Sequence, residues 1–186
     1  MDYSDEELAE LTLRNKKYFD PLVGKYAQKI RAYVARLTGN WPDSEDITQE
    51  AFIKAYVNIA SFNSKLKFSS WLYRIAHNEA VNYIKKHYRF RQVESSDEIK
   101  NKLIDDSPAL NKILEKENAK MIRDSLLKLK PRDREILELA YFEEKHYLEI
   151  ADILEISVNS VGPTIKRSRD KLKKILEKND KPGRKN

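Results

Sequence analysis

Acidic side chains are concentrated in the eight residues from Asp43 to Glu50, which contain four acids and no base. Asp43, Asp46 and Glu50 are spaced at i, i+3 and i+7, so in a helix they would form one acidic stripe. Carboxylates in such a stripe could bind a basic protein surface or, with further ligands, a divalent metal ion. We favour the protein surface, because no histidine lies near these acids in the sequence.

Basic side chains are concentrated in two other stretches. Residues 65–91 carry seven lysines and arginines against one acid, and residues 164–186 carry ten against three. The net charge of the whole chain is +6, so each stretch alone is about as positive as the entire protein. Bases interleaved with amides such as Asn78 and Asn82 suit the phosphates and base edges of nucleic acids.

No catalytic constellation accompanies these charges. The chain has no cysteine, so disulfides, thiolate nucleophiles and cysteine-bound zinc are excluded. His77, His87 and His146 are scattered and form no triad pattern, and no glycine-rich phosphate loop is present. The sequence therefore predicts a protein that is not an enzyme, with no cofactor, no metal and no small-molecule substrate.

The sequence also gives no sign of a membrane segment. No apolar run approaches the roughly 20 residues that span a bilayer. The N-terminal residues are acidic, unlike those of a signal peptide. We therefore expect a soluble, cytoplasmic protein without direct membrane insertion.

Hydrophobic periodicity near 3.6 residues predicts an all-α protein, and four helices account for its first part. The acidic stripe lies on the third of these helices and the first basic stretch on the fourth. Gly39 suits the C-cap of the second helix. The predicted helix starts are Ser4 (an N-cap that forms a capping box with Glu7), about Tyr18, Asp43 or Ser44, and Ser69 or Ser70.

Helical periodicity stops after Lys86 and resumes near Pro108. The segment between them is highly charged, which predicts a flexible linker between two small helical domains. Its acidic part, residues 94–106, could weakly mimic nucleic acid, but a solvated linker is the simpler interpretation. The predicted division is a first domain at 1–90, a linker at 91–107 and a second domain at 108–186.

The second domain ends in a helix-turn-helix pattern. A short helix over 147–154 and a turn over 155–157 precede a long basic helix from 158 to about 178. Such a helix reads bases in the major groove with its N-terminal half and holds phosphates with its flanks. We predict that Arg167 reads a base, because its guanidinium group can donate two hydrogen bonds to guanine O6 and N7. The other candidate DNA contacts on this helix are Ser160, Lys166, Arg169, Lys171 and Lys174.

Two ordered blocks of the first domain resemble region 2 of the bacterial sigma factors, specifically the extracytoplasmic-function group. They are Asp43-x-Glu45-Asp46-Ile47-x-Gln49-Glu50-x-Phe52-Ile53-x-Ala55-Tyr56 and Phe68-x-x-Trp71-Leu72-Tyr73-Arg74-Ile75-Ala76-x-Asn78. The second domain, from Leu129-Lys-Pro-Arg-Asp-Arg-Glu to Lys166-Arg-Ser-Arg, resembles region 4 of the same family.

The resemblance implies a sigma factor that binds core RNA polymerase through its β′ and β subunits and directs it to promoter DNA. Region 2 would bind and melt the −10 element, and the helix-turn-helix would bind the −35 element. An anti-sigma factor is an expected partner. The implied polymerase contacts are Asp43, Asp46, Gln49, Glu50 and Ile53. The implied −10 contacts are Phe62, Asn63, Lys65, Lys67, Phe68, Arg74, Asn78 and Lys85, with a flipped base held by the loop 62–67.

Four residues of these blocks have a structural interpretation as well. Trp71 is better explained as core than as a stacking platform, and Phe68 fits either role. Glu155 occupies a turn position where relatives usually carry glycine, which implies a left-handed conformation. Pro163 lies inside the recognition helix and lacks an N–H donor, so we expect a kink or a late helix start there.

Two other functions compete with the sigma interpretation. A helix-turn-helix regulator acting without polymerase would explain only the second domain. A carboxylate-metal hydrolase would use the acidic stripe as its metal site. Neither explains the ordered blocks between residues 43 and 86.

Overall fold

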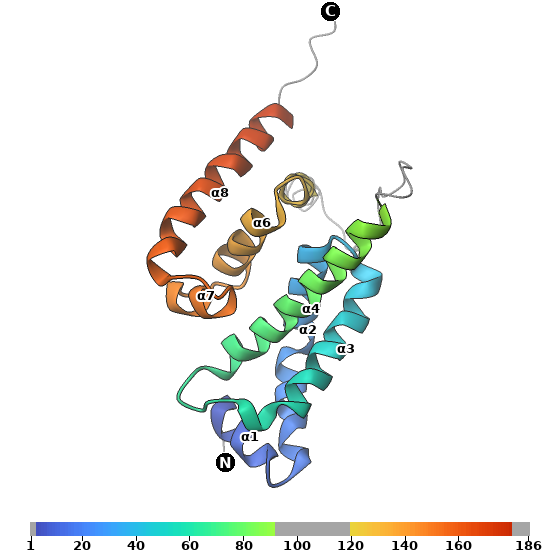
Figure 1. Cartoon of the computed structure of the whole chain (residues 1–186), viewed down its shortest axis with the longest axis vertical. Coiled ribbons are helices and arrows are strands. Elements are labelled where there is room, and N and C mark those ends of the chain that lie inside the picture. The colour runs from blue at the N-terminus through green and yellow to red at the C-terminus, as the bar shows by residue number, and fades with distance from the viewer. Residues whose placement is uncertain (1–2, 92–119, 180–186) are drawn as a thin grey trace, which may run out of the picture.

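The computed structural model describes residues 3–91 and 120–179, and every regular element in these ranges is helical (Figure 1). The first range contains α1 (Asp5–Thr12), η1 (Lys16–Phe19), α2 (Asp20–Thr38), α3 (Trp41–Val57), η2 (Ile59–Ser61) and α4 (Phe68–Arg91). The second contains helical residues 120–127, then α6 (Pro131–Leu137), η3 (Glu138–Phe142), α7 (Tyr147–Ile153) and α8 (Val158–Asn179). The predicted all-α class is confirmed. The predicted linker at 91–107, apart from its first residue, lies outside the described residues, as does the acidic segment 94–106.

The first domain is a bundle in which α2, α3 and α4 each pack against the other two. The apolar positions that repeat at three and four residues are the ones that face inward, and small alanines on α3 allow close packing. Burial of each large aliphatic side chain contributes about 1.5–3 kcal/mol. The buried side chains include Leu22, Ile30, Tyr33, Leu37, Ala51, Ala55, Leu72 and Ala76.

Two predicted helix ends are confirmed and one predicted start is wrong. Ser4 and Glu7 form a capping box, with N···O distances of 2.7 and 3.2 Å. Gly39 ends α2 with a left-handed φ of 71°. However, α3 begins at Trp41, before the predicted start, because the Asn40 side chain accepts the Asp43 N–H at 3.2 Å. The proline that follows Trp41 is tolerated because first-turn N–H groups have no partner within the helix.

The predicted helix-turn-helix is present as α7 and α8, and α8 also packs against α6. Glu155 in the turn has a φ of 51°, which is the left-handed conformation expected there. The expected late start of the recognition helix is wrong, since α8 begins at Val158 and continues through Pro163. The carbonyl that loses its partner belongs to Asn159, which is exposed and can bond to water instead.

The two domains pack against each other along α4 (Figure 1). α7 lies against α4, while α6 and η3 contact α2. Leu127 approaches Gly39 so closely that a Cβ at Gly39 would lie 2.8 Å from the leucine side chain. His77, also on α4, is only 9% exposed. Tyr33 of α2 covers it, with the hydroxyl 3.1 Å from His77 Nδ1.

Candidate protein and nucleic-acid interfaces

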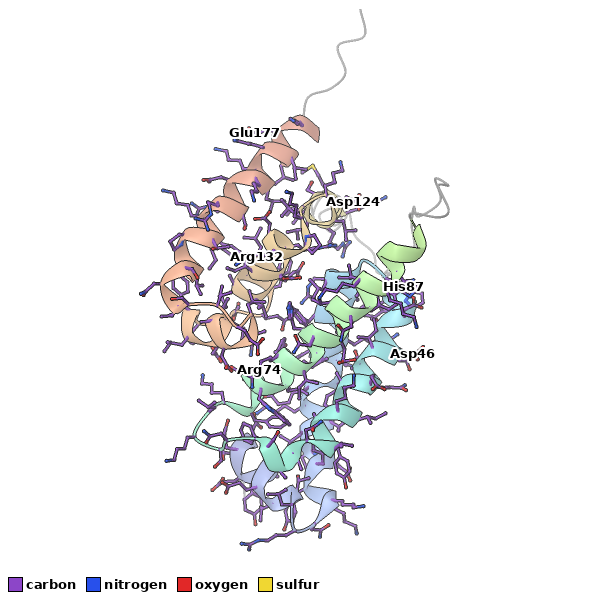
Figure 2. The ribbon with its side chains drawn as sticks, in the orientation of Figure 1. Asp46, Arg74, His87, Asp124, Arg132 and Glu177 are labelled. Carbon is purple, nitrogen blue, oxygen red and sulfur yellow. The ribbon has the colours of Figure 1, made fainter. Side chains whose placement is uncertain are left out.

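α3 presents acidic and apolar side chains together on its outer face. Asp46, Gln49 and Glu50 are exposed, and Ile53 keeps 56% of its surface accessible. Figure 2 shows Asp46 directed away from the bundle. Lys54, one turn after Glu50, lies 3.6 Å from that carboxylate and neutralises part of its charge. The face combines an apolar centre with charged surroundings, which is the composition of many protein interfaces.

Asp43, the fifth predicted polymerase contact, is engaged within the domain. Its carboxylate accepts a hydrogen bond from Asn40 Nδ2 at 2.7 Å and another from the hydroxyl of Tyr83 on α4. The side chain therefore ties the start of α3 to α4. It positions the acidic face and does not share the exposure of the other four residues.

The loop between η2 and α4 borders an open hollow of ≈ 620 Å³. Asn63 is exposed, and its side-chain oxygen accepts the Lys65 N–H at 3.0 Å, which shapes the loop. A hollow lined by charged, hydroxyl and apolar groups can accept an unstacked base. Its lining residues are Asp5, Glu6, Ser64, Lys65, Leu66, Lys67 and Ser69.

Three aromatic rings support this loop from inside the domain. The ring centroids of Phe62, Phe68 and Trp71 lie 5.4–5.8 Å apart. The assignment of Trp71 to the core is confirmed, since 8% of it is exposed. Phe68 has no exposed surface, so in this arrangement it cannot stack on a base. Phe62 is half-buried and is the ring of the three that a base could reach.

Two of the predicted −10 contacts form ion pairs with α7. Arg74 Nη1 lies 3.0 Å from Asp152 Oδ1, and Lys67 Nζ lies 3.5 Å from Glu149 Oε1. Figure 2 shows Arg74 on the side of α4 that faces α7. Asn78 and Lys85, further along α4, are exposed.

Five of the six predicted −35 contacts are exposed on α8, and three of the six form hydrogen bonds within the second domain. Arg167 Nη2 donates to Thr164 Oγ1 at 3.0 Å, which holds the guanidinium along the helix. Ser160 donates its hydroxyl to a backbone carbonyl at the helix start, at 2.6 Å. Lys171 binds both carboxylate oxygens of Asp133 at 2.7 and 2.8 Å, tying α8 to α6. The exposed residues are Lys166, Arg167, Arg169, Lys171 and Lys174.

A charged cluster between the domains was not predicted. Arg36 of α2 donates to Glu138 at 2.6 Å and also to Glu143, which in turn accepts a hydrogen bond from the Tyr73 hydroxyl. Burial raises the pKa of Glu138, and the charge of Arg36 opposes that rise. Arg36 is separated from the two acids by 102 and 107 positions, so no local pattern in the sequence could reveal the pairing.

Two further expectations can be compared with the part of the chain that the structure describes. Within residues 3–91 and 120–179, no group of histidine, aspartate and glutamate side chains could hold a metal ion. In the same ranges, no helix is both long enough and apolar enough to span a bilayer.

Comparison with known proteins assigns each of the two domains to a known family. Residues 22–90 match the family described as Sigma-70 region 2, and residues 119–172 match Sigma-70, region 4. The ECF RNA polymerase sigma factor SigW of Bacillus subtilis (strain 168) is 36% identical over 165 residues, which cover 85% of this chain and 88% of SigW. The RNA polymerase sigma-H factor of Pseudomonas aeruginosa is 34% identical over 184 residues, covering 93% of this chain and 94% of that protein.

Two solved structures have a similar fold. CnrH in complex with the cytosolic domain of CnrY aligns with a TM-score of 0.68 and 26% identity over 93% of this chain and 97% of CnrH. The sigma factor RpoE in complex with the anti-sigma factor NepR, from Bartonella quintana, aligns with a TM-score of 0.71 over 87% of this chain and 98% of RpoE. At 21% identity, the second likeness concerns the fold alone. Given both sigma regions in order and relatives aligned over most of their length, the chain belongs to the extracytoplasmic-function group of RNA polymerase sigma factors.

Proposed function

We propose that this sigma factor binds core RNA polymerase through the β′ and β subunits, recognises the −35 and −10 promoter elements, and initiates melting at −10. The observation that carries the proposal is the combination of an exposed acidic and apolar face on α3 with a basic helix-turn-helix in one chain. The protein would act by binding alone, so we assign it no catalytic residue and no cofactor. Its place of action would be the cytoplasm, where polymerase and promoter DNA are found.

The proposed polymerase interface is the outer face of α3. Ile53 supplies an apolar anchor, and Asp46, Gln49 and Glu50 around it would meet a basic surface of the β′ subunit. Asp43 contributes indirectly, because its hydrogen bonds to Asn40 and Tyr83 fix the first turn of the helix.

The proposed −10 interface combines the loop hollow with the basic side of α4. A flipped base would bind at the loop that borders the hollow, with Phe62 stacking on it, Asn63 and Lys65 offering polar contacts, and Phe68 supporting the loop from below. The phosphates of the non-template strand would run along α4. The residues that would hold them are Lys67, Arg74, Asn78 and Lys85.

The proposed −35 interface is the outer face of α8, where Arg167 would read a guanine. Lys166, Arg169 and Lys174 would bind phosphates. Lys171 would reach DNA only by exchanging its bonds to Asp133 for a phosphate. Ser160, whose hydroxyl now bonds to a carbonyl at the start of α8, would contact the sugar-phosphate backbone of the DNA there.

The competing functions explain less. A regulator that acts without polymerase is not favoured, because region 2 is present as well as region 4 and the sigma relatives align over nearly the whole chain. A metal-dependent hydrolase needs a ligand cluster, and none is found among residues 3–91 and 120–179.

We also propose a protein partner that restrains the sigma factor. RpoE has been solved with an anti-sigma factor, and a partner of this kind suits the division that we propose, with domains at 1–90 and 108–186 and a linker at 91–107. Such a partner would hold the domains in an arrangement that polymerase cannot use.

Co-purification with bacterial core RNA polymerase, followed by run-off transcription on fragmented genomic DNA, tests the proposed function. A stoichiometric complex that starts transcription at discrete sites is the expected result. Binding of the chain to duplex DNA without any complex with core enzyme would overturn the proposal and favour the regulator.

A further inference from the structure

The recognition helix α8 divides into an uncharged first half and a charged second half. Residues 158–165 contain no lysine, arginine, aspartate or glutamate, whereas residues 166–174 contain six bases and one acid. A helix in the major groove places its N-terminal residues against base edges, while basic side chains along its flanks hold phosphates. The half of α8 that would lie deepest in the groove therefore has to read bases with neutral groups.

Helical periodicity separates the inner and outer sides of this uncharged half. Val161 and Ile165 are buried against the rest of the domain. Asn159 and Pro163 are exposed and lie one turn apart on the opposite side of the helix. Ser160, between them in the sequence, is half-buried and has its hydroxyl bonded to a backbone carbonyl. The side of α8 turned away from the domain core thus offers a base one amide and one apolar ring.

Packing within the domain accounts for Gly162 but not for Pro163. A Cβ at Gly162 would lie 3.3 Å from Cε2 of Tyr147, so glycine allows α7 to approach α8 closely. Pro163 is exposed and does not belong to the hydrophobic core. It also weakens the helix, because it provides no N–H for the carbonyl of Asn159. Proteins break such local rules mainly at functional sites, so we looked for a function of the ring itself.

An apolar ring in the major groove matches one feature of the base edges. All four bases present hydrogen-bond donors or acceptors there, and thymine alone adds a C5-methyl group. The proline ring can pack on that methyl group and has almost no side-chain freedom to lose when it does. Arg167 follows one turn later, about 6 Å further along the helix axis. A thymine under Pro163 would therefore lie within about two base pairs of the guanine under Arg167.

We propose that Pro163 is a specificity-determining residue of the −35 interface, and that its ring packs on the C5-methyl group of a thymine. The inference rests on the proposed function for the placement of α8 in the major groove. Removing one methyl group from water corresponds to about a fourfold gain in affinity. Arg167 would recognise the nearby guanine, and the bases of the charged half would add affinity without selecting a sequence.

Uracil provides a direct test, because it differs from thymine only in lacking the methyl group. The full chain is first used to select its preferred element from a pool of random-sequence duplexes. Each thymine of the selected element is then replaced in turn by uracil, and binding is measured by fluorescence anisotropy. One replacement, within about two base pairs of the guanine read by Arg167, should weaken binding about fourfold. The other replacements should have little effect.

Two substitutions separate the proline ring from its effect on the backbone. Pro163→Val and Pro163→Ser both restore the N–H that the carbonyl of Asn159 lacks, so both variants should fold. Pro163→Val keeps an apolar group and should still prefer thymine over uracil by at least about twofold. Pro163→Ser should bind the two duplexes equally. Lys174→Ala is the matched control, because it should weaken binding to both duplexes and keep the fourfold preference.

The absence of any uracil-sensitive thymine from the selected element would overturn the inference. The same holds if Pro163→Ser keeps the full preference, or if Pro163→Val loses it as completely as Pro163→Ser does. Selection that enriches no sequence would also overturn it, because α8 would then read no base. Failure of the proposed function would be a different result, in which the full chain selects a duplex element but forms no complex with core polymerase.

Discussion

The helices α3 and α8 each have an exposed outer face, whereas α4 and α7 cover each other at the contact between the domains. α3 and α8 present Asp46, Ile53 and Arg167 to solvent, whereas α4 and α7 pair Arg74 with Asp152 across the domain contact. The outward helices carry the proposed polymerase and −35 interfaces. The covered pair contains the proposed −10 interface on α4.

The difference suggests an order of events. An exposed face can bind at once, but a covered face binds only in the fraction of molecules in which the domains have parted. The outer face of α3 is therefore available to polymerase as it stands, whereas Lys67 and Arg74 of the proposed −10 interface must first exchange their acidic partners on α7 for phosphates.

The largest effect is expected on the exposed face of α3. Asp46→Ala/Glu50→Ala should weaken core polymerase binding by roughly 2–4 kcal/mol, because both charges lie beside the apolar anchor Ile53. Fluorescence anisotropy of the labelled sigma factor with core enzyme measures this loss. Compactness in scattering should not change, since neither residue contacts the second domain.

Glu45→Ala is the matched control for that double variant. Glu45 is exposed on the same helix but pairs with Arg31 of α2 at 3.0 Å, away from the stripe. An equal loss of affinity from Glu45→Ala would show that α3 binds polymerase through its total charge. Asp46 and Glu50 would then contribute no more to binding than the ion-paired Glu45.

The same contrast explains how much the sequence could predict. Periodicity, caps and turns located the helices, because these are local features of the sequence: Ser4 marks the start of α1 and Gly39 the end of α2. The exposed faces of α3 and α8 were predictable for the same reason. The Arg36 cluster and the burial of His77 were not, because both depend on contacts between segments far apart in the chain.

A pH-dependent loss of stability should distinguish the covered helix α4 from the exposed ones. Burial, with a smaller effect of Lys85, lowers the pKa of His77 to about 4 from its ordinary value of 6.5. Between these values the unfolded chain binds a proton that the folded chain does not, so stability rises with pH and is lost as pH falls from 6.5 toward 4. The loss at pH 5 should be about 2 kcal/mol relative to pH 7.5.

Urea unfolding at the two pH values measures this loss, and His77→Asn is the comparison that isolates it. Burial raises the pKa values of Glu135 and Glu138, so these carboxyls change stability with pH in the opposite direction. They are present in both proteins and cancel in the difference. A pH dependence that is the same with and without His77 would show that its imidazole titrates normally and is not enclosed as described.

On the exposed helix α8, Arg167→Ala should cost roughly 1–3 kcal/mol at one −35 base pair and little at the others. Lys174→Ala should instead weaken binding to every duplex equally and lower the salt dependence by about one charge. Competition binding of the full chain with duplexes substituted one pair at a time separates the two. A uniform loss for Arg167→Ala would reassign that residue to phosphate binding.

The smallest expected effect is a change in stability from the turns on either side of α7, which connect this covered helix to its neighbours. Glu144 and Glu155, with φ of 49° and 51°, flank α7, and a left-handed conformation costs a non-glycine residue about 1 kcal/mol. Glu155→Gly relieves this strain but adds freedom to the unfolded chain, so a net stabilisation of roughly 0.5 kcal/mol is expected in urea unfolding. Glu155→Ala keeps the Cβ and its strain and should not stabilise the protein. Equal stabilisation by both would mean that the charge of Glu155, and not its backbone conformation, is what strains the turn between α7 and α8.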